Sequence, residues 1–323
     1  MKRRTFTLGL LAARAAGGVR AQEAWPSRPV TIVVGFPPGT ATDSVARLLA
    51  DSFGRSFPGQ RFIVENRPGQ GGSAGAASVA RAEPDGYTIT VGASAPQAIN
   101  PHIYPSLRYD PRTDFTPIGR IVTLPYVLVA NREKPWRSMA DLVAAAKAKP
   151  GDVSFASTGN GTTSHLLMAM FEHATGTRLN HIPYRGTAQS VTDIIAGRVD
   201  VTFDTVVGCL PFIQDDRVRP LAVGTEKRSS LLPNVPTTTE QGFPAVKGGA
   251  WLALFGPANL PAPIVAKLSD ALGTALKDEG LLAKLRTIGT EPDLSTPEEM
   301  GRVLRQDYDM WGEIVKRTGA KAE

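Results

Sequence analysis

The chain has 323 residues, of which 42% are hydrophobic and 20% are charged, a balance that excludes a disordered, collagen-like or coiled-coil protein. Its single cysteine, Cys209, excludes an internal disulfide and any cysteine-rich zinc or iron–sulfur site. The formal charge of +6 points to nucleic acid or an anionic membrane only if that charge belongs to the mature chain.

The first 21 residues are predicted to be a signal peptide. A basic start is followed by a short apolar run and by a small-x-small triplet that ends before Gln22. The string Arg3-Arg4-Thr5-Phe6 also resembles a twin-arginine signal. This segment holds five basic residues and no acidic one, so its removal leaves 31 basic and 30 acidic residues and a mature charge of +1. We therefore expect a periplasmic protein that binds no nucleic acid.

Strands and helices alternate from residue 30 onward. Hydrophobic patterning predicts strands at 30–34, 62–65 and 88–91, with helices at 43–57 and 73–82 between them. This order predicts a parallel, doubly wound sheet.

A second unit with the same order follows. The predicted strands are 126–130, 153–156, 181–184, 199–203 and 218–223, and the predicted helices are 139–148, 162–175 and 188–196. The last third has one strand-like run, 251–255, and predicted helices near 264–276, 281–288 and 297–318. The last of these begins with Thr296-Pro297-Glu298-Glu299, an explicit helix start.

The strand-poor last third is expected to pack back on the first unit. This predicts a discontinuous lobe 1 made of residues 22–124 and 223–323, and a lobe 2 made of residues 125–222. The chain would then cross between the lobes near 122–126 and near 218–224.

Two alternatives from other classes are weak. Residues 71–75 match the G-x-S-x-G string of a hydrolase, but Pro68, Gly69 and Gln70 separate the strand from Ser73, whereas a nucleophile elbow needs the strand to run directly into the serine. An α/β serine hydrolase using Ser73 therefore stays a minor alternative. His165 and His173 lie eight residues apart, which is not the spacing of a zinc clasp, so we expect no metal and no cofactor.

Two loops stand out as anion sites. Residues 35–43 and 157–164 each follow a predicted strand, are rich in Gly, Ser and Thr, and begin a helix. Each presents free backbone N–H groups and a positive helix end, which can hold an anion without arginine. Ligands of doubly wound sheets bind beyond the carboxyl ends of the strands, so two such loops could hold a small carboxylate, although both could also be ordinary turns.

Read together, motifs along the mature chain resemble the periplasmic solute receptors of tripartite tricarboxylate transporters, the Bug-type proteins. The motifs that carry the resemblance are the segments 25–34, 36–39, 64–69, 84–88, 114–118, 157–166, 183–186, 203–204, 232–237 and 296–299. Any one of them is weak evidence, but together they are specific.

This resemblance implies a type II periplasmic-binding fold: two doubly wound α/β lobes around a ligand cleft, with a hinge and no catalysis. It also implies which residues line the cleft. From lobe 1 these are Phe36, Gly39, Thr40, Ala41 and Asp43, joined by Ser94; from lobe 2 they are Thr158, Asn160, Gly161, Thr162, Ser164, Tyr184, Gly186 and Asp204. For Asp204 a structural role is equally compatible with the sequence. The family usually has a second glycine where Thr40 stands, so the approach of the backbone there can differ.

The function that the resemblance implies is capture of a small carboxylate, either a di- or tricarboxylate or an aromatic carboxylate. The receptor, expected to be a monomer, would deliver the solute to the permease subunits of a tripartite transporter. A receptor that signals to a membrane protein has the same features, so sensing remains an alternative to transport.

Overall fold

The computed structural model describes residues 25–184, 186–319 and 321. The predicted signal peptide lies outside these residues and stays a prediction. None of the helices in the described part of the chain is both long and apolar enough to span a bilayer.

The first half of the molecule is built on three parallel strands. β1 (Val30–Val34) pairs with β2 (Phe62–Asn66) and with β3 (Thr88–Ala93), and α1 (Ala41–Ser56) and α2 (Ser73–Ala80) connect them. These five elements agree with the predicted ones to within a few residues. The sheet is not parallel throughout, because β9 (Gly249–Pro257) returns from the other half of the molecule and runs antiparallel to β3.

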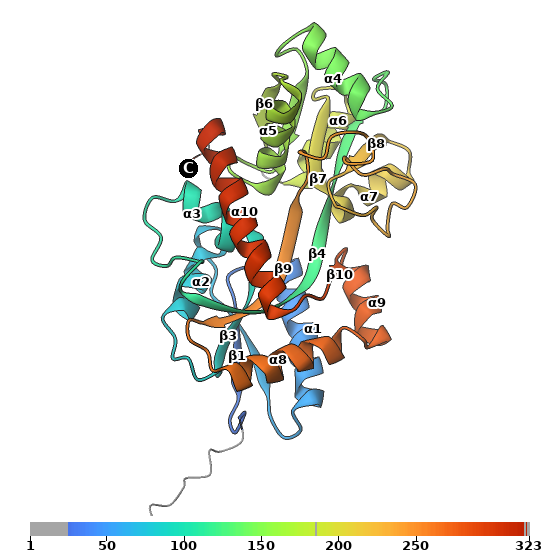
Figure 1. The fold of residues 1–323 in the computed structure, drawn as a ribbon. Coiled ribbons are helices and arrows are strands. Elements are labelled where there is room, and N and C mark those ends of the chain that lie inside the picture. Colours follow the sequence, from blue (N-terminus) through green and yellow to red (C-terminus); the bar gives the residue numbers. More distant parts are fainter. Residues whose placement is uncertain (1–24, 185, 320, 322–323) are drawn as a thin grey trace, which may run out of the picture.

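A long strand, β4 (Phe115–Asn131), joins the two halves of the molecule (Figure 1). It pairs with β9 as far as Pro125 and with β7 (Val201–Thr205) from Tyr126 onward. The sequence predicted only its second part, 126–130. The first part was not predicted because it contains Pro117, Gly119 and Pro125, and proline and glycine weaken a strand pattern. Its register with β9 also shifts twice, and such shifts mark bulges.

The second half continues the sheet from β4. β5 (Ser154–Ser157) pairs in parallel with β6 (Asn180–Pro183) and β7, whereas β8 (Val218–Val223) pairs antiparallel with β4. Its helices are α4 (Met139–Ala148), α5 (Thr163–Thr175), α6 (Thr187–Ile195) and α7 (Val206–Gln214). α7 was not predicted, because it contains Gly208 and an internal Pro211, and both residue types disfavour a helix.

The remaining elements follow β3 and β9 or precede α2. A short helical turn, Ala95–Ile99 (η2), and α3 (Asn100–Ile103) follow β3; neither was predicted, since each contains a proline. After β9 come α8 (Ala262–Ala275), α9 (Glu279–Thr287), the two-residue strand β10 (Glu291–Pro292) and α10 (Pro297–Thr318). The predicted start and end of α10 are both correct. One turn, Gln70–Gly72 (η1), precedes α2.

Each half of the molecule has an apolar core, and the core of the second half also includes Ala98, Ile99 and Ile103, which follow β3. Ile32, Leu49 and Phe53 belong to a core between the first sheet, α1 and α8. Phe155, Leu166 and Phe171 belong to a core of the second half under α5. The parallel strands β1, β3, β5 and β7 leave these cores at their carboxyl ends, where the loops of interest begin.

Candidate functional site

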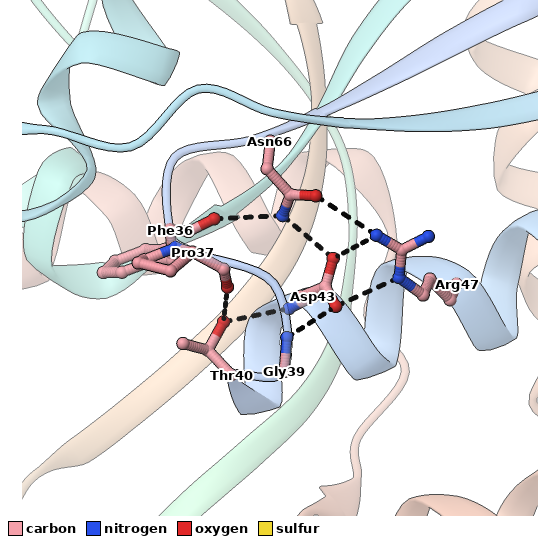
Figure 2. A network of polar contacts seen from close by, with 7 residues as sticks. All are labelled: Phe36, Pro37, Gly39, Thr40, Asp43, Arg47 and Asn66. Carbon is pink, nitrogen blue, oxygen red and sulfur yellow. Dashed lines mark hydrogen bonds and ion pairs between the residues drawn. The ribbon is translucent and has the colours of Figure 1, made fainter.

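The loop between β1 and α1 is organised around Thr40 (Figure 2). Thr40 is the N-cap of α1, with an extended backbone at φ −73° and ψ 161°, and its hydroxyl accepts a hydrogen bond from the Asp43 N–H at 3.4 Å. The same hydroxyl donates to the Pro37 carbonyl at 2.9 Å. Gly39 has φ +84°, a backbone conformation in which side-chain-bearing residues are strained. The Thr40 hydroxyl is therefore engaged within its own loop.

Asp43 fixes the conformation of this loop through its carboxylate (Figure 2). Its carboxylate accepts hydrogen bonds from the Gly39 N–H at 2.9 Å and the Asn66 amide at 2.9 Å, and it forms an ion pair with Arg47 at 2.9 Å. Asn66, at the end of β2, also donates to the Phe36 carbonyl at 3.0 Å. Although burial opposes ionisation, the hydrogen bonds from Arg47, Gly39 and Asn66 hold the pKa of Asp43 below its usual range. The charge of Asp43 is neutralised internally.

Two backbone donors remain at the start of α1. The N–H groups of Ala41 and Thr42 are the first two of the helix, and among the described residues neither has an acceptor. Both donors lie at the positive end of the 16-residue helix α1. This arrangement suits an anion that is held by main-chain donors.

The loop between β5 and α5 has the same construction. Thr162 is the N-cap of α5 at φ −73° and ψ 160°, and its hydroxyl accepts from the His165 N–H and donates to the Gly159 carbonyl at 2.8 Å. The Thr158 hydroxyl contacts that of Thr162 at 3.3 Å, and Asn160 occupies the exposed tip. The N–H groups of Thr163 and Ser164 have no acceptor among the described residues.

Glycines set the shape of this second loop. Gly159 and Gly161 have φ of +126° and +73°. A Cβ on Gly161 would lie 2.8 Å from the side chain of Ile103 in α3, so the loop packs closely against an element of the first half. Gly186, the N-cap of α6, has an extended backbone and open space around it.

Stacked rings support the second loop from behind. His165 and His181 stack with ring centroids 4.2 Å apart, and Phe155 stacks on His181 at 4.6 Å. His165 Nδ1 accepts from the Gly161 N–H at 3.1 Å, and His181 Nε2 lies 2.7 Å from the Ser157 hydroxyl. Burial and the neighbouring His181 lower the pKa of His165 to about 4, so the ring is neutral near pH 7. His165 thus supports the loop through its hydrogen bond to Gly161.

Ser94 and Ser164 are unusual buried hydroxyls. Ser94 follows β3 at 1% exposure and Ser164 lies in the first turn of α5 at 0% exposure. Neither Oγ has a hydrogen-bond partner among the described residues. Buried hydroxyls are normally bonded, so each has a donor and an acceptor to offer at the strand ends.

Asp204 ends β7 at 2% exposure. Its Oδ1 accepts from the Thr205 N–H at 2.6 Å, and burial raises the pKa of the carboxyl. Burial, and to a smaller extent the charge of Asp204, raises the pKa of Tyr126, the residue at which β4 changes partners. The Oδ2 of Asp204 is buried and has no hydrogen-bond partner among the described residues.

Tyr184 lines a cavity of about 470 Å³ together with Ile182, Pro183 and Gln189. The Tyr184 N–H donates to the Ser157 carbonyl at 2.9 Å, which places this cavity directly beside the second loop. The phenol donates a hydrogen bond to Asp193 at 2.9 Å.

Sequence reasoning missed several residues that build the site. Asn66 and Arg47 fix the first loop, and His181 fixes the second. Asn66 could have been found, because it ends β2 next to the end of β1 in a parallel pair. The contribution of His181 depends on a ring stack between residues 16 positions apart, which has no local signal.

Ser73 has structural contacts rather than those of a nucleophile. It is 1% exposed, and its hydroxyl is bonded by the Asn100 amide at 2.8 Å and the Tyr109 hydroxyl at 3.1 Å. Neither partner is a general base. Within residues 25–184, 186–319 and 321, no group of three or more His, Cys, Asp and Glu side chains could hold a metal ion.

Known proteins are similar to the chain over nearly its whole length. The model of a family described as "Tripartite tricarboxylate transporter family receptor" matches residues 45–320. Rpa4515 of R. palustris, solved with adipate, is 35% identical, with 92% of this chain and 99% of that chain covered and a TM-score of 0.74. MatC (Rpa3494) of Rhodopseudomonas palustris, solved with bound malate, is 29% identical, with coverage of 90% and 100% and a TM-score of 0.71.

A third similar structure differs from these two in its state. It is a TctC solute-binding protein from Polaromonas with no ligand, 28% identical, with coverage of 91% and 99% and a TM-score of 0.84. At nearly the same identity as the malate-bound protein, the ligand-free one superposes better on this chain.

Proposed function

Because this chain belongs to the receptor family of tripartite tricarboxylate transporters, whose members are periplasmic solute-binding proteins and not enzymes, we propose that it captures a small carboxylate between the 36–43 and 157–164 loops. The observation that carries this proposal is the pair of capped helix starts. α1 and α5 each begin at a threonine cap of the same geometry, followed by two N–H groups that have no acceptor among the described residues. A carboxylate has four acceptor positions, which matches such a set of donors.

The residues of the predicted site are proposed to have four roles. Ser94 and Ser164 are proposed to contact the ligand, because their buried hydroxyls lack partners among the described residues. Thr40, Asp43, Thr158 and Thr162 are proposed to hold the loops, since their polar atoms are engaged there. Phe36, Gly39, Asn160, Gly161, Tyr184 and Gly186 would border the ligand, and Asp204 would stabilise the strand ends from beneath.

The structure is proposed to represent an open state of two lobes. The better superposition on the ligand-free relative than on the two ligand-bound ones supports this assignment. Lobe 1 would comprise residues 22–124 and 223–323 and lobe 2 residues 125–222, with β4 and the β8–β9 connection as crossings. Closure around the ligand would then proceed as a hinge motion.

We further propose that the receptor is a monomer and that it delivers the solute to membrane permease subunits. Its export would use a cleavable, twin-arginine-like signal peptide. The two similar structures with adipate and malate support a carboxylate as the ligand class.

A thermal-shift panel tests the proposal. Purified mature protein is melted with acetate, benzoate, succinate, malate, adipate and citrate, and with adipamide as the uncharged match of adipate. At least one carboxylate should raise the melting temperature by about 5 °C at a hundredfold excess over its Kd, with saturable heat in calorimetry. Adipamide should have no effect. If no carboxylate shifts the melting temperature, or if an amide works as well as its acid, the proposal is wrong.

A further inference from the structure

Helix α10 packs on both halves of the molecule. Its first part contributes Met300 and Leu304 to a core that also contains Val33 of β1 and Phe255 of β9. Its second part contributes Trp311, Ile314 and Val315 to the core under α5 in the second half. Figure 1 shows the helix (red) running from beside β10 to beside α3 and α5.

The middle of α10 is fixed to a strand that crosses between the halves. Trp251 of β9, which is buried, donates its indole N–H at 2.6 Å to Oδ2 of Asp307, which is half-buried. Trp251 pairs with Thr123 of β4, three residues before β4 changes partners at Tyr126. The helix is thus anchored in the first half and at the crossing strands, and its last two turns reach the second half.

We define the α10–α5 seam as Trp311, Ile314 and Val315 of α10 packed against Leu166, Leu167 and Met170 of α5. These six residues are between 0% and 7% exposed. A Cβ on Gly248, next to β9, would lie 2.9 Å from Leu167 and 3.6 Å from Trp311, so the crossing chain closes the seam from one side. A hydrogen bond between Arg317 and His173 of α5 adds a polar tie at its end.

The seam has to respond when the halves rotate about the crossing strands. Because α10 is anchored in the first half, rotation of the second half slides or separates α5 from Trp311 and its neighbours. A close-packed apolar interface resists this, since displacement forfeits contacts and exposes apolar surface. Met168, Met170 and Met310 belong to or border the same core, and their flexible side chains allow sliding at a limited cost.

We propose that α10 is a third connection between the lobes, and that the α10–α5 seam favours the open arrangement and thereby raises the apparent Kd for the ligand. This inference rests on the proposed carboxylate-binding function. The seam is buried in an arrangement that superposes better on a ligand-free similar structure than on the adipate- and malate-bound ones, so closure has to overcome its contacts. The apparent Kd rises in proportion as the binding-competent closed state becomes rarer.

The first test needs no ligand. Spin labels are attached at Lys149→Cys and Lys277→Cys, two exposed positions on opposite halves, and double electron–electron resonance measures the distance between them. Cys209 is buried and should stay unlabelled. Ile314→Ala should increase the short-distance, closed population about tenfold over the unsubstituted labelled protein. Leu304→Ala is the matched control, because it removes a buried side chain from the same helix in the half that faces the first core.

A milder variant guards against misfolding. Arg317→Gln removes the tie to His173 without touching the apolar core, and it should shift the same population in the same direction by a smaller factor. Circular dichroism melts confirm that each variant folds. The proposal is overturned if the unsubstituted protein, Ile314→Ala and Arg317→Gln have equal distance distributions. It is also overturned if Leu304→Ala shifts the closed population as much as Ile314→Ala does.

A second arm adds 10 mM sodium adipate. If adipate closes the unsubstituted protein, Ile314→Ala should bind it three- to tenfold more tightly, and an unchanged or weaker affinity contradicts the proposal. If adipate closes no variant, this counts against adipate as the cargo, whereas the ligand-free comparison still decides the role of the seam.

Discussion

Asp43 shows how an acidic side chain can belong to a site for anions. Alone, a carboxylate at the start of α1 would repel an acid. Here Arg47, Asn66 and the Gly39 N–H surround it, so its charge is balanced and its geometry holds the loop. The sequence predicted Asp43 as a member of the site, but its place beneath the loop depends on Asn66, 23 positions away.

Replacing Asp43 tests this role. Asp43→Asn keeps the shape but removes the charge that Arg47 and Gly39 bind, so we expect a loss of about 1–3 kcal/mol of stability and a weaker affinity for the carboxylate found in the panel. Chemical denaturation and calorimetry measure the two effects. Asp51→Asn, at an exposed position on the same helix, should change neither. Unchanged affinity in Asp43→Asn would separate this residue from the site.

The pKa of His165 predicts a pH dependence. It is lowered to about 4, first by burial and second by the charge of His181. Between about pH 6.5 and pH 4 the unfolded chain therefore binds a proton that the folded chain refuses, so stability is full above about pH 6.5 and falls towards pH 4. Urea midpoints across this range should fall less in His165→Asn. His173→Asn, outside the ring stack, should retain the original slope; equal slopes in all three proteins would contradict the assignment.

At the scale of elements, three helices begin with the same construction. Thr40, Thr162 and Thr296 cap α1, α5 and α10 with φ near −70° and ψ near 160°. α10 continues with Pro297 at its first position, where no N–H is needed, whereas α1 and α5 continue with residues that keep the N–H. α10 therefore lacks one of the first-turn donors that α1 and α5 retain.

Ala41→Pro exploits this comparison. Thr40 already has the backbone that a following proline requires, so the variant removes one N–H from α1 with little strain. We expect the affinity for the carboxylate to fall by about tenfold or more, the value of a hydrogen bond to a charged group, while the melting temperature is kept. Ala41→Ser retains the N–H and is the control. An Ala41→Pro protein that binds as tightly as Ala41→Ser would remove α1 from the site.

At the scale of the whole molecule, the formal charge of +6 says little about binding. The five basic residues of the first 21 positions account for most of it, and the chain from Gln22 onward carries +1. The proposed capture would then depend on a few local donors rather than on a long-range field. The seam under α10 adds a conformational cost that no single loop contains.

Salt dependence distinguishes local capture from a charged funnel. Because the proposed donors are backbone groups in a sheltered cleft, raising sodium chloride from about 0.05 to about 0.5 M should change the Kd less than about threefold. Calorimetry of the bound carboxylate at both salt concentrations measures this, with potassium sulfate of matched ionic strength as a control for chloride competition. A tenfold or greater loss in both salts would point to long-range attraction instead.

Features that depend on residues close together along the chain could be predicted from the sequence. Threonine caps act over three residues and apolar periodicity over a few turns, so most helices, the parallel strands and both glycine-rich loops could be predicted. Only the tertiary structure decided the antiparallel return of β9, the passage of β4 through its prolines, the support of Asp43 by Asn66 and the seam between α10 and α5. These features join residues far apart in sequence, and their energies arise from packing and hydrogen bonds that exist only once both halves are assembled.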